Sequence, residues 1–179
     1  MARTRNHRVN AVAGLTLGST GFTMISEDTT GAPTDYHTLI RFQGTLGAIA
    51  GGAALGLGRQ LLTWPVGPCI VLKQDHIKAS VKGVAGNSAN VPTIGVGTVV
   101  ASGAVSVLSG TSTFQNAVTG IAAANSNGSV AEQVLAPQLT FLPGASSRSL
   151  FFNVAATWSV ADPAALIYGE YRVNWCRFG

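Results

Sequence analysis

The sequence predicts an all-β protein, a β-sandwich preceded by an extended N-terminal arm. From residue 61 onward, short apolar runs recur at regular spacing and are separated by turns rich in Gly, Pro and Asn. Several runs alternate apolar and polar residues with the period of two that a half-buried strand requires. No segment shows the helical period of an amphipathic helix. This combination is typical of β-sandwiches and barrels, and a jelly roll is one member of that set that the pattern alone does not select.

The chain is unusually poor in charge. Charged residues make up 10% of its 179 residues, against about 25% in ordinary soluble domains. Residues 83–131 contain no Asp, Glu, Lys or Arg, and residues 83–161 contain only Glu132 and Arg148. Gly, Ala, Val, Ser, Thr and Asn take their place, a mixture that suits tightly packed β-structure held against other chains. The composition therefore favours a structural or assembly protein over an enzyme.

Residues 1–60 are expected to form an extended arm or docking segment, and residues 61–179 the β-sandwich domain. In the first part, short apolar pieces alternate with turn-rich runs. The uncharged segment 42–58 is rich in Gly and Ala, whereas a membrane-spanning helix needs about 20 predominantly apolar residues. We therefore expect an extended Gly/Ala segment there and no membrane partner.

The first strands are predicted at 61–64, which ends at a Pro-rich turn, and at 69–82. In the second half of 69–82, two sets alternate: Asp75, Ile77, Ala79 and Val81 against His76, Lys78, Ser80 and Lys82. This period of two predicts an apolar face and a basic face. Residues 93–100 and 103–108 form two further β-rich runs. Residues 111–119 suit a strand or a short helix, and 130–142 another strand in which Pro137 indicates an edge or a break.

Two long strands are predicted to close the chain, at 150–158 and 166–178. In the first, every second residue is apolar, so that one face carries Phe152, Val154, Ala156 and Trp158. In the second, one face carries Ile167, Tyr171, Val173 and Trp175, and the other carries Glu170, Arg172 and Asn174. Both patterns predict strands with one face in the core.

No catalytic, metal-binding or cofactor-binding residue is predicted, and no enzyme activity. The pairs Gly56-x-Gly58 and Gly95-x-Gly97 lack the third glycine and the helix of a dinucleotide site, so strand or turn glycines are expected. Asp75 and His76 are neighbours in a strand and point to opposite faces. Cys69 and Cys176 match no metal spacing, and a disulfide between them stays open.

Two groups of residues are candidates for contacts with other chains. The basic residues Arg3, Arg5, Arg8, Lys78 and Lys82 could meet an acidic partner surface, with plain solvation as the alternative. Trp64, Trp158 and Trp175 are candidate subunit-interface aromatics, with core packing as the alternative. Nucleic-acid binding is not expected, because three arginines in the arm are few for packaging a genome.

Three segments carry a resemblance to a known group of proteins. Residues 58–67 (GRQLLTWPVG), 94–114 (IGVGTVVASGAVSVLSGTSTF) and 150–158 (LFFNVAATW) resemble virion proteins of tailed bacteriophages, specifically head decoration or cement proteins. The resemblance covers about residues 58–179 and departs from the group's pattern at Phe151–Asn153 and in the long N-terminal arm.

The resemblance implies a protein of the capsid exterior, a homotrimer with a sandwich or jelly-roll core whose partner is the major capsid protein. The expected function is to bind the outer head surface and stabilise the shell. Two alternatives stay open: another virion component, namely a tail or fibre protein or a small shell-forming capsid protein, and a carbohydrate-binding β-sandwich with an exposed tryptophan.

Overall fold

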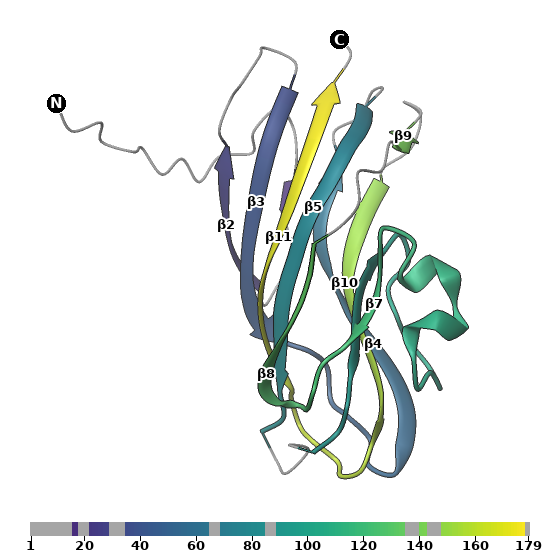
Figure 1. The fold of residues 1–179 in the computed structure, drawn as a ribbon. Helices are drawn as coiled ribbons and strands as arrows, with labels where there is room; N and C mark the ends of the chain where they lie inside the picture. Colours follow the sequence, from purple (N-terminus) through teal and green to yellow (C-terminus); the bar gives the residue numbers. More distant parts are fainter. Residues whose placement is uncertain are drawn as a thin grey trace, which may run out of the picture.

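The computed structural model describes residues 16–17, 22–28, 35–64, 69–84, 89–134, 140–142 and 148–177. These residues form an all-β fold in which two antiparallel sheets pack face to face (Figure 1), which confirms the predicted β-sandwich. The strands are β1 (Thr16–Leu17), β2 (Phe22–Asp28), β3 (Asp35–Thr45), β4 (Ala53–Trp64), β5 (Cys69–Lys82), β6 (Thr93–Gly97), β7 (Val118–Ala122), β8 (Asn127–Val134), β9 (Thr140–Leu142), β10 (Arg148–Trp158) and β11 (Leu166–Arg177).

The strand order differs between the two sheets. Sheet A has the order β1-β4-β10-β6-β7, and sheet B has the order β2-β3-β11-β5-β8, with β9 beside β5. The two strands that the sequence predicted best, β10 and β11, lie at the centre of their sheets. Each is therefore paired on both sides. Buried and exposed residues alternate along β11, whereas β10 is buried on both faces, since Asn153 and Ala155 are covered as well.

The core lies between the sheets and is closed by aromatic contacts. Trp64 of sheet A meets Trp175 of sheet B edge-on, with 5.2 Å between ring centroids, and Phe152 meets Phe42 at 4.9 Å. The predicted inward sets of β5, β10 and β11 are buried here: Ile77, Ala79, Val81, Phe152, Val154, Ala156, Trp158, Ile167, Tyr171, Val173 and Trp175. The face assignments made from these three alternating patterns are thus confirmed.

The expected division at residue 60 does not match the structure. β3 is an internal strand of sheet B, and β4 is paired with β10 along its whole length. Residues 35–60 therefore belong to the sandwich and do not form an arm. The glycines of segment 42–58 concealed β4, because Gly weakens the strand pattern that sequence reasoning relies on. Residues 1–15 lie outside the described residues.

The region after β6 also departs from the expectation. β6 ends at Gly97, and residues 98–117, which we call the cover segment, contain no strand. Instead they form bends and two short 3-10 turns, Leu108–Gly110 and Ser112–Phe114. The β-branched residues that suggested two strands here belong instead to a loop that packs against sheet A.

Candidate functional site

The cover segment lies on the outer face of sheet A, where glycines let it approach closely. A side chain at Gly58 would meet Asn153 and Ala101, and one at Gly97 would meet the backbone of Phe114. The same holds for the other glycines beneath the cover, which are Gly56 and Gly95. All four are strand glycines, as expected. Gly56, Gly58 and Gly97 admit backbone of the cover, and Gly95 admits the side chains of Leu108 and Gln115.

Asn153 fastens the cover to the sheet. Its side chain is fully buried. Its Oδ1 accepts a hydrogen bond from the Ala101 N–H at 2.8 Å. Its Nδ2 donates to the carbonyl of Val99 at 2.9 Å and to the carbonyl of Phe114 at 2.8 Å. One neutral amide therefore holds both ends of the cover, beside a small apolar cluster formed by Ala101, Leu108, Phe114 and Ala155.

The outward surface of the cover is uncharged and partly apolar. Val99, Val100 and Val107 are 43%, 39% and 47% exposed. The whole cover lies within the charge-free stretch 83–131. We call the surface of these three valines the neutral face; it presents small apolar groups and no ionised group of its own.

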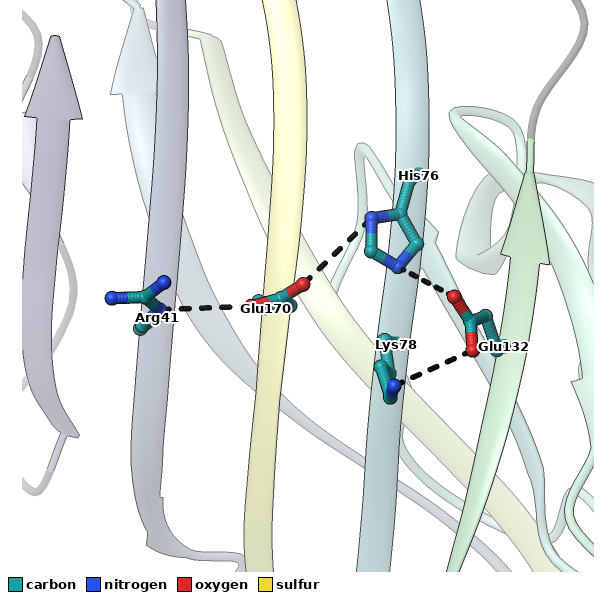
Figure 2. Close-up of polar contacts among 5 residues, drawn as sticks. All are labelled: Arg41, His76, Lys78, Glu132 and Glu170. Atoms are coloured by element: carbon teal, nitrogen blue, oxygen red, sulfur yellow. Dashed lines mark ion pairs between the residues drawn. The ribbon is translucent and has the colours of Figure 1, made fainter.

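The outer face of sheet B has the opposite character. Arg41 of β3, Glu170 of β11, Lys78 of β5 and Glu132 of β8 are direct cross-strand neighbours in register, which we call the charged row. Their charges alternate in sign across four strands (Figure 2). Arg41 Nε lies 3.6 Å from Glu170 Oε2, and Lys78 Nζ lies 3.5 Å from Glu132 Oε2. Opposite charges placed directly across a sheet stabilise the pairing of strands.

His76 lies between the two carboxylates of the charged row. Its Nε2 is 3.2 Å from Glu132 Oε1, and its Nδ1 is 3.8 Å from Glu170 Oε1. Because the carboxylates face opposite ring nitrogens, one metal ion could not bind all three groups. In the part of the chain that the structure describes, no group of three or more His, Cys, Asp or Glu is arranged to hold a metal. The arrangement is that of an ion-pair network.

The structure separates the predicted contact residues into three groups. Lys78 is paired in the charged row, and Lys82 is exposed further along the same strand. Arg3, Arg5 and Arg8 lie outside the described residues. Trp64, Trp158 and Trp175 are buried at 2%, 0% and 0% exposure. They pack in the core of a single chain, so they have no accessible surface to offer to another subunit.

Two of the three tryptophans are also fixed by hydrogen bonds. Trp158 Nε1 donates to the Leu55 carbonyl at 3.1 Å, and Trp175 Nε1 donates to Thr38 Oγ1 at 3.0 Å. Buried indoles normally find such partners. These are all the tryptophans of the chain, so the exposed tryptophan that would favour carbohydrate binding is absent.

Sequence reasoning missed Arg41 and Glu132 as parts of a site. Glu170 was placed on the polar face of its strand, and Lys78 on the polar face of β5, but their neighbours were unknown. Arg41 was hidden in the expected arm. Only the register of β3, β11, β5 and β8 brings the four charges into one row, and no local sequence signal contains that register.

The described residues contain no helix long and apolar enough to cross a membrane. No family model matches the chain, and no curated protein matches it.

Proposed function

We propose that the protein is a non-enzymatic structural protein of a virion, a decoration protein that binds the outer surface of a phage head and stabilises the shell. The observation that carries the proposal is the neutral face, because the segment with the strongest resemblance to decoration proteins, residues 94–114, also forms this surface. The resemblance adds a homotrimer and a jelly-roll connection of the strands, which stay part of the proposal.

The physical argument concerns the desolvation of the contact. A decoration protein must bury surface against a shell, and removing charges from water costs several kcal/mol for each ion. A surface with exposed Val99, Val100 and Val107 and no ionised group avoids that cost. The hydrogen bonds of Asn153 hold the surface in one shape before binding, which reduces the entropy lost on binding.

Other contact residues remain candidates beside the neutral face. Lys78 is partly neutralised by Glu132, so Lys82 is the better candidate for an acidic patch on the major capsid protein. The three arginines Arg3, Arg5 and Arg8 keep their proposed contact role on sequence grounds.

The experiment that tests the proposal measures binding to heads that lack the protein. Purified protein is added to such heads, the bound fraction is measured by sedimentation, and the melting temperature of the heads is measured by scanning calorimetry. We expect saturable binding and a higher melting temperature. Heads of equal stability with and without the protein would contradict a cementing function.

A pair of variants tests whether the neutral face makes the contact. Val107→Asp adds a charge to the neutral face, and Val91→Asp adds one to an exposed valine outside the cover segment, at 57% exposure. We expect the first variant to lose head binding and the second to keep it. Equal loss in both would remove the neutral face from the proposal. Cryo-electron microscopy of particles then separates decoration from the tail, fibre and shell alternatives by the position of the chain.

A further inference from the structure

We propose that two copies of the chain pair through the outer face of sheet B, about a two-fold axis that runs parallel to the strands between β11 and β5. The inference concerns the free protein in solution and does not rest on the proposed function, whose homotrimer concerns the protein bound to the head. It starts from the charged row, whose order across the sheet is Arg41, Glu170, Lys78, Glu132 (Figure 2).

The charged row is antisymmetric about its centre. A two-fold axis between β11 and β5, in the plane of contact, places each residue over the residue at the mirrored position in the second copy. Arg41 then faces the partner's Glu132, and Glu170 faces the partner's Lys78. Each positive charge of the row meets a negative one. An axis perpendicular to the strands would instead bring like charges together, so the pattern selects one of the two simple arrangements.

Size complementarity in the next row agrees with the same axis. This row consists of Gln43, Tyr168, Ser80 and Val130. The axis places Tyr168, which is 45% exposed, over the partner's Ser80, a small residue that is 8% exposed. Val130, 56% exposed, comes over the partner's Gln43. Because the two copies are related by symmetry, the contact between Tyr168 and the partner's Ser80 occurs twice, as every contact of an isologous interface does.

The charged side chains keep enough free surface for a second contact. The side chains of Arg41, Lys78 and Glu132 are 52%, 47% and 48% exposed despite their ion pairs, and that of Glu170 is 26% exposed. A third row contains Arg172 of β11 and His76 of β5, which are direct cross-strand neighbours. The axis places Arg172 over the partner's His76. That imidazole lies between Glu132 and Glu170, so Arg172 meets a group flanked by negative charge.

The first measurement is the mass of the full-length protein by analytical ultracentrifugation at low and high salt. We expect a dimer that weakens as salt rises, because screening reduces contacts between exposed charges. A monomer at all concentrations would overturn the proposal, and so would a trimer.

Two charge-swap variants then test the surface itself. The double variant Lys78→Glu/Glu132→Lys keeps the ion pair between β5 and β8 but brings like charges together in both intermolecular contacts. The double variant Arg41→Glu/Glu170→Arg keeps the ion pair between β3 and β11 and also brings like charges together in both intermolecular contacts. Both double variants also place like charges at the neighbouring positions 78 and 170, so this cost within the chain is common to the two. Each variant alone is expected to weaken dimerisation at least about tenfold.

The mixture of the two variants provides the decisive result. In a heterodimer of the two, every contact of the charged row between the two chains again joins opposite charges. We expect the mixed sample to form a dimer about as stable as that of the parent chain, which also shows that both variants are folded. Variants that still dimerise alone, or that fail to pair when mixed, would overturn the proposed surface.

Discussion

The outer faces of the two sheets handle their polar groups in opposite ways. On sheet A, a neutral amide, Asn153, is sealed from water and makes three hydrogen bonds. On sheet B, ionised groups stay half in water and pair with each other. Burying an unpaired charge costs far more than burying a satisfied amide. The comparison accounts for the lack of charge at the buried residues of the cover segment, Ala101, Leu108 and Phe114, which lie against sheet A.

The comparison predicts its largest effect at Asn153. In Asn153→Asp the side chain keeps an acceptor for the Ala101 N–H but loses the donors to the carbonyls of Val99 and Phe114, and it adds a buried charge. We expect a loss of about 3 to 5 kcal/mol of unfolding free energy, measured by urea denaturation. The control is Asn116→Ala, which removes an exposed amide bonded to Thr98 at the rim of the cover and is expected to cost about 1 kcal/mol or less. Equal losses would mean that Asn153 does not fasten the cover.

A smaller effect is expected from filling the space beneath the cover. Gly58→Ala adds a methyl group where the Asn153 amide and the backbone of Ala101 already lie, so the cover must shift. We expect a loss of about 1 to 3 kcal/mol, the usual cost of overpacking. Gly110→Ala is the matched control, because nothing lies within 4 Å of a side chain at that position. Similar stability of both variants would show that the cover adapts freely.

These two positions also show what the sequence could and could not predict. The alternation in β10 predicted that Phe152, Val154, Ala156 and Trp158 face the core, because a period of two is a local property. The role of Asn153 was not predicted, because its three partners lie 39 to 54 residues away. The glycines of β4 were taken for part of an arm, since close approach of another segment is a tertiary property. The charged row was missed for the same reason.

Tyr171 extends the comparison to the two faces of one strand. It is fully buried on the inner face of β11, next in sequence to Glu170 of the charged row. Burial raises the pKa of the Tyr171 phenol well above its ordinary value. The folded state therefore keeps a proton that the unfolded state releases above about pH 10, so stability is complete below that pH and falls as the pH rises.

The test compares Tyr171→Phe with Tyr168→Phe, which changes an exposed tyrosine on the same strand. The unfolding free energy of each is measured from neutral to alkaline pH, together with the absorbance of tyrosinate. We expect Tyr171→Phe to flatten the alkaline decline and Tyr168→Phe to leave it unchanged. An identical decline in Tyr171→Phe and the parent would contradict the assignment.

The smallest effect is expected in the charged row itself. A double-mutant cycle on Lys78 and Glu132, with Ala at each position, should give a coupling of about 0.5 kcal/mol that disappears at high salt, because both groups are half exposed. The same cycle on Arg41 and Glu170, whose Nε and Oε2 atoms lie 3.6 Å apart, should also give a small coupling that disappears at high salt. Dilute protein is needed, so that pairing between chains does not contribute.

A coupling that persists at high salt would mean that this face is shielded from water as the face of sheet A is, and the contrast between the two sheets would then fail. A small, salt-sensitive coupling would instead leave these charges available for recognition between chains, since they add so little to the stability of the fold.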